Sequence, residues 1–327
     1  MNRDLPIFCA IAFFAAVGVT AIVTADVEDA NWTVANACVQ ENGETLVQFD
    51  GKPEAYYQIQ ASTDLRNWLP LATVEGAGKV EYTDGSARYK SSYYYRATEQ
   101  TGEGIVTGDH LQTENGDLLI HPVNHASFVL LWNGISIYSD PVGSASLYSG
   151  LPLADVVLVT HEHGDHFNDA TINTVLAESG VVIAPQETYS RLRTTLRSAN
   201  TPMANGESRE VGGVTVDAVP SYNSRHPKGR GNAYIVTIGG KRIYISGDTG
   251  DIAEMRALQN IDVAFLCMNV PFTMTVSEAA SAVRDFKPSV VYPYHYRNQN
   301  NSLSDLVEFT QLVGANDGVE VRRRSWY

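Results

Sequence analysis

The sequence has few cysteines and no excess of basic residues. Its 327 residues include three cysteines, and Cys38 and Cys267 fall in different predicted domains, so we expect no disulfide framework. The formal net charge is −14, which argues against a general nucleic-acid-binding surface but leaves a local basic patch open. Hydrophobic residues make up 44% and charged residues 18% of the chain, values typical of globular rather than disordered proteins.

Residues 1–25 are typical of a signal peptide. Arg3 precedes an apolar stretch from Leu5 to Val23, and Val23-Thr24-Ala25 offers small residues for cleavage. The apolar stretch is also long enough to span a bilayer, so an uncleaved membrane anchor is the alternative. We therefore expect an exported protein, periplasmic or extracellular, with membrane anchoring left open.

Residues 27–100 have the pattern of a small all-β sandwich domain. Apolar and polar residues alternate at 57–61, 80–82 and 93–97, and turn-forming residues lie between these runs. The run from Tyr57 to Trp68, with Tyr95-Arg96-Ala97 later, resembles fibronectin type III-like modules attached to secreted bacterial proteins. Trp68 and the tyrosines could contact a glycan or a protein, but we favour a role in the core of the sandwich. Thr101 to Gly104 is the expected linker.

The most informative stretch is Val156 to His166. It begins as a Val- and Leu-rich run suited to one buried strand and then presents three histidines and an aspartate within six positions. Side chains at 161 and 163 project to the same side of an extended chain, and Gly164 allows the chain to turn. Imidazole and carboxylate suit Zn²⁺, Fe²⁺ or Mn²⁺, and open α/β sheets place such residues at strand ends.

Further polar residues follow other expected strands. Asn133-Gly134 predicts a hairpin between 128–132 and 135–138, and its second arm leads to Asp140. Asp248 follows a strand at 241–245, and His295 follows one at 289–292. His125 precedes the hairpin, where we expect it to pack or cap. The remaining pattern predicts helices at 169–178, 187–197, 275–286 and 304–313, and strands at 181–184, 214–220, 233–238, 262–266 and 319–322.

These motifs resemble the metallo-β-lactamase superfamily. His161-x-His163-x-Asp165-His166, Asp140-Pro141, Ser246-Gly247-Asp248-Thr249 and Pro293-Tyr294-His295-Tyr296 match its loops in order and context. The resemblance covers about residues 104–327 and is strongest to the broad branch of metal-dependent hydrolases. It implies an α/β fold in which two β-sheets are covered by helices on both sides, an αββα sandwich.

The resemblance also implies a centre with two divalent metal ions, Zn²⁺ first and Mn²⁺ or Fe²⁺ as alternatives. It implies that His161 and His163 bind the first metal, that Asp165, His166 and His295 bind the second, and that Asp248 bridges them. Asp140 would orient a ligand from behind. The paired metals would activate a water for attack on an ester, lactone or phosphodiester-type small-molecule substrate. Asp165 is the candidate general acid/base.

The third ligand of the first metal is open. Asn223 stands where the family usually has a histidine, and His226 follows three residues later. The same loop carries Arg225, Lys228 and Arg230, which could attract an anionic substrate or could form an ordinary solvated loop. Tyr222, Tyr292 and Tyr296 could line the cleft or simply pack.

Two other functions stay open at this point. One is a non-hydrolytic metal-binding protein of the same fold that acts as a surface or interaction protein. The other is an oxidoreductase that uses two irons in the same ligand set, which ranks lower because nothing suggests a flavin domain. The sequence does not reveal the substrate, because loop shape determines it.

Overall fold

The computed structural model describes residues 20–21, 32–40, 42–89, 94–314 and 318–327. It divides the chain into two compact units, residues 1–110 and 111–327. Most of the expected export segment, residues 1–25, lies outside the described residues, and so does Tyr93. Among the described residues, no helix has the length and apolarity needed to cross a membrane.

The first unit is built from short strands. Its strands form two sheets, ordered β1-β3-β4-β7 and β6-β5-β8-β2. Their bounds are β1 (Thr20–Ala21), β2 (Trp32–Val34), β3 (Asn36–Val39), β4 (Thr45–Gly51), β5 (Tyr56–Ser62), β6 (Leu69–Glu75), β7 (Gly78–Asp84) and β8 (Tyr94–Gln100), with a 3-10 turn at Ser86–Tyr89.

The aromatic residues of this unit divide into two kinds. Tyr57, Tyr82 and Tyr95 are buried in a core that draws residues from both sheets, as the alternating pattern predicts. Trp68 is half-buried, and the Arg96 guanidinium lies 4.2 Å from the centre of its ring. The favoured interpretation of these aromatics therefore holds for the three tyrosines and not for Trp68. The resemblance to fibronectin type III-like modules stays a prediction.

Two sheets form the middle of the second unit. The first has the order β14-β13-β12-β11-β10 and the second β15-β16-β17-β18-β19-β20-β21. The strands are β10 (Gly116–Asn124), β11 (Ser127–Trp132), β12 (Ile135–Ser139), β13 (Ala154–Leu158), β14 (Leu176–Ile183), β15 (Ser208–Val211), β16 (Val214–Ser221), β17 (Gly231–Ile238), β18 (Lys241–Ile245), β19 (Val263–Cys267), β20 (Val290–Tyr294) and β21 (Glu320–Val321); β9 (Gly108–Thr113) contains the point at which the units divide.

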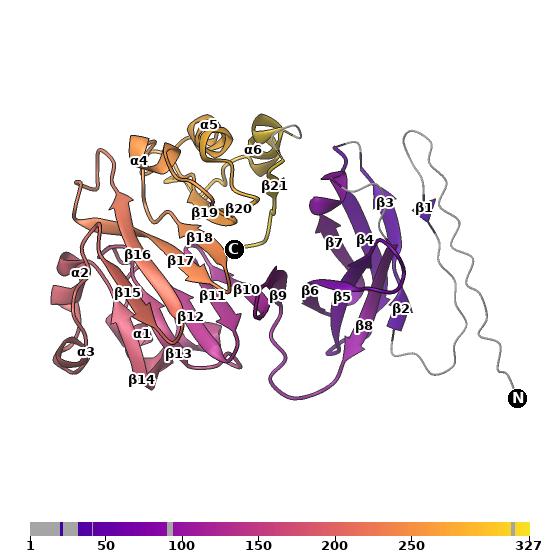
Figure 1. Ribbon diagram of the computed structural model, residues 1–327, viewed down its shortest axis with the longest axis horizontal. Coiled ribbons are helices and arrows are strands. Elements are labelled where there is room, and N and C mark those ends of the chain that lie inside the picture. Colours follow the sequence, from indigo (N-terminus) through magenta and orange to yellow (C-terminus); the bar gives the residue numbers. More distant parts are fainter. Residues whose placement is uncertain (1–19, 22–31, 41, 90–93, 315–317) are drawn as a thin grey trace, which may run out of the picture. The chain divides into compact units, whose positions relative to one another are not determined.

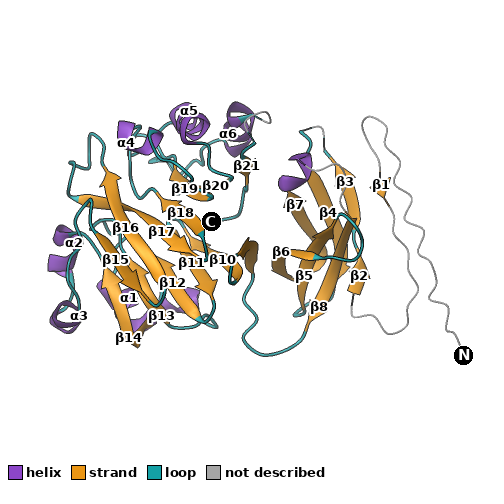
Figure 2. Cartoon of the chain, in the orientation of Figure 1, coloured by secondary structure: helices purple, strands orange, loops and turns teal. Residues whose placement is uncertain are grey.

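Helices cover the outer faces of both sheets (Figures 1 and 2). They are α1 (Asp169–Val175), α2 (Gln186–Arg191), α3 (Thr194–Ala199), α4 (Ala253–Arg256), α5 (Val276–Phe286) and α6 (Leu306–Val313), with a 3-10 turn at Ala145–Tyr148. Ile172 of α1 and Leu196 of α3 pack with Val157 of β13, whereas Val283 of α5 and Phe309 of α6 join the core of the second sheet. The mixed α/β architecture is that of two sheets between helices.

The hairpins that lead to the site formed as predicted. Asn133 and Gly134 both have positive φ, 47° and 79°, as the expected two-residue turn requires. β11 and β12 pair across this turn, and β17 and β18 pair across Gly239-Gly240. In each sheet the neighbouring strands switch from antiparallel to parallel pairing after the hairpin, at β12–β13 and at β18–β19. Parallel strands end at the same edge, which brings their loops together.

Two helix predictions were wrong, one at its end and one in its middle. α1 begins after Asn168, whose Oδ1 accepts from two backbone N–H groups, but it ends at Val175 rather than Glu178. Leu176 instead pairs with Ala154 of β13, because strand pairing there satisfies the backbone groups. The helix expected at 187–197 breaks into α2 and α3 at Leu192 and Arg193. Arg193 is held there by its backbone N–H and its Nε, which donate to the Asp169 carboxylate at 2.8 and 2.7 Å.

The start of α5 gives a test of local stability. The Thr275 hydroxyl accepts from the Glu278 N–H at 3.2 Å, and the Glu278 carboxylate accepts from the Thr275 N–H at 2.8 Å. Thr275→Ala should lower the free energy of unfolding by about 1 kcal/mol, because the Glu278 N–H loses its acceptor and the Glu278 carboxylate loses the hydroxyl that donates to it. Denaturant titration measures this. Ser277→Ala, exposed in the same turn, is the control; equal losses in both variants would contradict the role of the cap.

Candidate functional site

The polar residues that the sequence singled out follow strand ends at one edge of both sheets. The first sheet supplies Asp140 after β12 and the stretch 161–166 after β13; the second supplies 223–226 after β16, Asp248 after β18 and His295 after β20. Asp140 and His295 have φ of 41° and 46°, in the left-handed region that non-glycine residues seldom adopt. The chain therefore turns sharply where these side chains enter the site.

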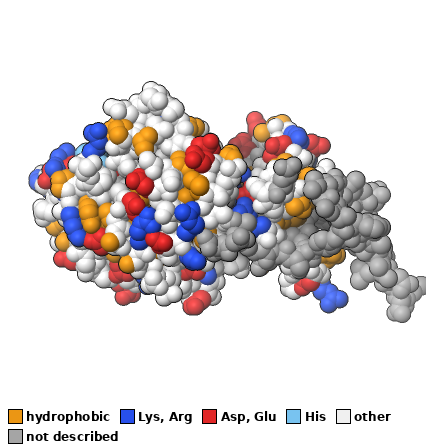
Figure 3. Space-filling view, turned by 90° about the horizontal axis from the view of Figure 1, so that it is seen from above, with side chains coloured by type: hydrophobic (Ala, Val, Ile, Leu, Met, Phe, Trp, Pro, Cys, Tyr) orange, Lys and Arg blue, Asp and Glu red, His pale blue; other side chains and the backbone are white. Residues whose placement is uncertain are grey.

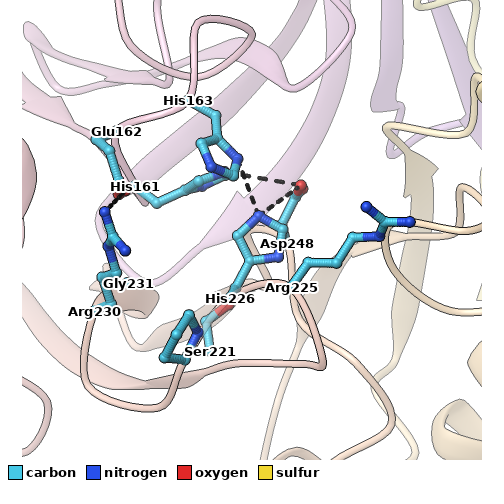
Figure 4. Close-up of a pocket in the computed structure, with 10 residues that line it drawn as sticks. His161, Glu162, His163, Ser221, Arg225, His226, Arg230, Gly231 and Asp248 are labelled. Atoms are coloured by element: carbon cyan, nitrogen blue, oxygen red, sulfur yellow. Dashed lines mark hydrogen bonds and ion pairs between the residues drawn. The ribbon is translucent and has the colours of Figure 1, made fainter.

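Three histidines form the first group. His161, His163 and His226 offer ring nitrogens that all lie within 4.8 Å of one another. His226 Nε2 lies 3.1 Å from His163 Nδ1 (Figure 4). His161 is buried at the end of the strand, whereas His163 is exposed.

The second group contains Asp165, His166, His295 and His125, with ligand atoms again within 4.8 Å of one another. His166 Nε2 and His295 Nε2 are 2.9 Å apart, and both rings are buried. Asp165 Oδ2 lies 3.5 Å from His295 Nε2 and 3.8 Å from His166 Nε2. His125 Nε2 lies 3.2 Å from the same oxygen.

The buried carboxylate of Asp248 lies between the two groups. Its Oδ1 is 3.2 Å from His166 Nε2 and 3.3 Å from His295 Nε2. Its Oδ2 is 3.8 Å from His161 Nε2 and 3.7 Å from His226 Nε2. One oxygen thus faces each group, the arrangement that a bridging carboxylate requires.

Asp140 and Thr160 determine which nitrogens of His166 and His161 carry hydrogen. The Asp140 carboxylate accepts from the Thr160 N–H and the Thr160 hydroxyl, both at 2.7 Å, and from His166 Nδ1 at 2.8 Å. The Thr160 hydroxyl has one hydrogen, which it donates to Asp140. It must therefore accept from His161 Nδ1, which lies 3.1 Å away. Both rings therefore carry hydrogen on Nδ1 and turn Nε2 toward the cluster, as the nitrogen available to a cation.

Asn223 determines which ring nitrogen of His226 carries hydrogen. Its amide nitrogen donates to the carbonyl oxygens of Asp248 and Phe272, both at 2.9 Å, which fixes the orientation of the amide. Its Oδ1 accepts from His226 Nδ1 at 3.0 Å and from the backbone N–H groups of Arg225 and His226. The Asn223 oxygen is thus occupied within its own turn, while His226 Nε2 faces the cluster.

The donor set fits a divalent cation. His161 Nε2 and Asp248 Oδ1 are buried in the cluster without a hydrogen-bond partner. Leaving buried polar atoms unpaired costs free energy, and a cation bound between them would remove that cost. His166 Nε2 and His295 Nε2 lie 2.9 Å apart, close enough for one metal ion to bind both once any hydrogen between them is displaced.

The shifted pKa values of the cluster also suit the binding of a cation. Burial and the nearby His166 lower the pKa of His161, which favours its neutral, ligand-competent form. Burial alone would lower the pKa of His166, but the carboxylates of Asp248 and Asp140 raise it well above its ordinary value. Burial would raise the pKa of Asp248, but His295 and His166 hold it well below its usual range. A cation would displace the proton that these groups share, so its binding should weaken at low pH.

A pocket opens beside the first group. Its lining includes the three histidines and Asp248 together with Glu162, Arg225 and Arg230. Figure 4 shows the two arginines on opposite sides of the histidines. Arg230 forms a 2.8 Å ion pair with the buried Glu162 carboxylate. On the face seen in Figure 3, basic side chains of the described residues are interspersed with acidic ones.

The other substrate-binding candidates lie elsewhere. Lys228 forms an ion pair with Glu254, and the Tyr222 hydroxyl donates to the same carboxylate at 2.9 Å. Tyr296 is buried and donates to the Arg324 carbonyl at 3.2 Å. Tyr292 is buried in the core, where it stacks on Phe265. The structure does not place these side chains in the lining of the pocket.

Sequence reasoning missed the place of His125 and the roles of Thr160 and Asn223. His125 was expected to pack or cap, yet its ring lies in the second group. The only local signal was a polar residue directly before a buried strand, which many turns share. Thr160 and Asn223 act through hydrogen bonds to histidines, and composition and spacing do not reveal such bonds.

Comparisons with known proteins agree with this geometry. A family model described as a beta-lactamase superfamily domain matches residues 119–295. The chain belongs to the metallo-β-lactamase superfamily. Similar proteins include a Pyrococcus abyssi protein described as a metal-dependent hydrolase, 36% identical over 169 residues that cover 49% of this chain and 74% of that protein. A Thermus thermophilus protein of the same description is 33% identical over 187 residues, 53% of this chain and 81% of that one.

A solved structure of a superfamily member is similar as well. A Parabacteroides distasonis protein described as a metal-dependent hydrolase aligns with a TM-score of 0.60 at 36% identity, covering 67% of this chain and 99% of that one. The residues matched by the family model, 119–295, run from before His125 to His295. All the residues of the two groups therefore fall inside the superfamily domain.

The role of Asn223 can be tested on the metal-free protein. Asn223→Ala should lower the free energy of unfolding by about 1–3 kcal/mol, because the Asp248 and Phe272 carbonyls and two turn N–H groups lose their partner. Chemical denaturation in the presence of a chelator measures this loss. Ser224→Ala, an exposed change in the same turn, should leave stability unchanged. An Asn223→Ala variant as stable as Ser224→Ala would show that Asn223 does not hold the turn.

Proposed function

We propose that the protein is a hydrolase that uses two divalent metal ions, most simply Zn²⁺, to cleave an ester, lactone or phosphodiester-type bond in an anionic small molecule. The observation that carries the proposal is the convergence of the two ligand groups on Asp248, with ring nitrogens turned inward and buried atoms left without hydrogen-bond partners. The similarity to proteins described as metal-dependent hydrolases supports the same reaction class.

The geometry suggests which residues would hold each ion. His161, His163 and His226 would hold the first, Asp165, His166 and His295 the second, and Asp248 would contact both. Mn²⁺ and Fe²⁺ suit the same nitrogen and oxygen donors. When bound, such ions lower the pKa of a water molecule to near neutrality and stabilise negative charge that develops on the substrate oxygen. We favour His226 over Asn223 as the third residue, because the Asn223 oxygen already accepts three hydrogen bonds.

Asp165 is suited to proton transfer. Its side chain is 50% exposed, so it lies where substrate and solvent can reach it. Burial alone would raise the pKa of Asp165, but hydrogen bonds from His125 and His295 lower it well below its usual range. The ionised carboxylate can take a proton from the attacking water and return it to the leaving oxygen. Asp140 orients His166, and Thr160 orients His161.

Arg225 is the residue best placed to recognise an anionic group. Of the three basic residues in its loop, Lys228 and Arg230 are paired with Glu254 and Glu162. In the part of the chain that the structure describes, Arg225 forms no ion pair; its Nε donates to the Pro271 carbonyl at 3.3 Å and its guanidinium lies over the Phe272 ring. Its charge at the pocket rim is thus available to a phosphate or carboxylate.

Metal-loaded protein should hydrolyse at least one of a chromogenic panel of phosphodiesters, esters and lactones. Asp165→Asn should reduce kcat by about 100-fold or more, because an amide cannot relay the proton. Metal content is measured on the same samples by elemental analysis. A variant with full metal content and parental turnover would remove Asp165 as the acid/base. Protein that binds metal but cleaves nothing in the panel would instead favour a non-hydrolytic role.

Arg225→Gln should raise KM for anionic substrates by about 10-fold and leave KM for matched neutral esters unchanged, because the lost interaction is electrostatic. Steady-state kinetics on both substrate types at two salt concentrations provides the measurement. Arg209→Gln, which removes a cation that bonds the Thr201 carbonyl away from the pocket, is the control. An equal change in KM for charged and neutral substrates would contradict the assignment.

A further inference from the structure

His125 is held at the site by its own backbone. It occupies the turn between β10 and β11 with a φ of 55°, a conformation that a histidine seldom adopts. Its N–H donates to the Trp326 carbonyl at 3.0 Å, and its carbonyl accepts from the His295 N–H at 3.2 Å. The ring centres of His125 and His295 are 3.8 Å apart. The segment at 326–327 and the loop after β20 thus fix the position of this ring from two sides.

The side chain of His125 connects Tyr327 to Asp165. His125 Nδ1 lies 2.8 Å from the Tyr327 hydroxyl, and Nε2 lies 3.2 Å from Asp165 Oδ2. The Tyr327 hydroxyl also accepts from the Arg297 backbone N–H at 3.1 Å. Burial raises the pKa of Tyr327 to about 12, so the hydroxyl keeps its proton at neutral pH.

These contacts determine the tautomer of His125. If Nδ1 carried the hydrogen, Nε2 would present a lone pair to the negatively charged Asp165 oxygen, which is repulsive. If Tyr327 donates to Nδ1 instead, the hydrogen lies on Nε2 and is donated to the carboxylate. In the second arrangement the Arg297 N–H donates to the Tyr327 hydroxyl, the hydroxyl donates to His125, and His125 donates to Asp165, so every donor has an acceptor.

Asp165 needs such a partner more than the other members of its group. Its side chain is half exposed, whereas His166 and His295 are buried. The oxygen that faces the ring nitrogens of His166 and His295 is Oδ2, the same oxygen that His125 contacts. A carboxylate oxygen has lone pairs enough to accept a hydrogen bond and bind a cation together. The bond from His125 therefore holds the Asp165 oxygen within the second group.

We propose that His125 and Tyr327 are positioning residues: Tyr327 fixes the tautomer of His125, and His125 fixes the rotation of the Asp165 carboxylate toward the second metal. The inference rests on the proposed function in one respect, the binding of a metal by Asp165. Hydrogen bonds from outside the ligand set that orient a ligand typically change metal affinity by about 10- to 100-fold.

Tyr327→Phe is a clean probe, because the ring has packing partners of its own. The Arg297 guanidinium lies 4.1 Å from the ring centre, and the Tyr296 ring meets it edge-on at 5.0 Å. Phenylalanine can keep both contacts and lacks only the hydroxyl. Tyr189→Phe is the matched control, since it removes a half-buried hydroxyl that donates to the Arg197 carbonyl on the outer helices.

Two measurements are made on the full chain. Competition with a chromogenic chelator gives the Zn²⁺ affinity, and absorption spectra of the Co²⁺-loaded protein report the ligand set. Tyr327→Phe should weaken the binding of one of the two metal ions by about 10- to 100-fold. It should lower the melting temperature of the metal-free protein no more than Tyr189→Phe does, because each variant removes one hydroxyl that makes two hydrogen bonds. His125→Gln should retain more affinity than His125→Ala, because the amide N–H can still donate to Asp165. Adding Tyr327→Phe to His125→Gln should have no further effect, because an amide has no tautomer to fix.

Parental affinity in Tyr327→Phe, or an equal loss in Tyr189→Phe, would overturn the proposal. So would a His125→Gln variant as weak as His125→Ala with altered Co²⁺ bands, which would make His125 a ligand itself. A parental protein that binds neither Zn²⁺ nor Co²⁺ would instead disprove the proposed function. Chelator-treated parental protein and its metal-free melting curve separate that result from misfolding.

Discussion

The site depends on one buried carboxylate. Asp140 is fully buried, so its charge must be matched by hydrogen bonds, and it receives three: two from Thr160 and one from His166. The bond to the Thr160 hydroxyl in turn obliges that hydroxyl to accept from His161. One interaction at the end of β12 thereby sets the proton positions of two histidines, each in a different ligand group. Desolvating this carboxylate costs free energy that only the complete network offsets.

The strands that lead to the site were predictable, and the helix ends were not. The hairpins at 133–134 and 239–240, the strand before His161 and the capped start of α5 carry local signals that the tertiary structure leaves unchanged. The break at Leu192 and Arg193 depends on Asp169, which lies far away in the sequence. Leu176 leaves the helical pattern because β13 offers it backbone partners. Long-range hydrogen bonds of this kind overrode the local periodicity.

For the site itself, spacing in the sequence located the residues but not the bonds that orient them. His161, His163, Asp165 and His166 stand in one short stretch, so their proximity follows from the chain. Asn223 was noted for its place in the sequence, and its function emerged only from the turn in which its amide faces two carbonyls and one imidazole. His125 reaches Asp165 across two strands of the same sheet, a contact that local pattern cannot indicate.

Close backbone packing at two glycines, Gly247 and Gly250, holds the loop of Asp248 against its neighbours. A Cβ on Gly247 would lie 2.9 Å from Thr160 Cβ, and a Cβ on Gly250 would lie 2.9 Å from Asn223 Cβ, so neither position has room for a side chain. Gly247 also has a φ of 56°, which glycine adopts without strain. Asp248 lies between these contacts, and its loop touches the two residues that orient His161 and His226. The contact of Gly247 with Thr160 therefore couples the loop of Asp248 in the second sheet to the first sheet, and the contact of Gly250 with Asn223 ties the same loop to the residue that orients His226.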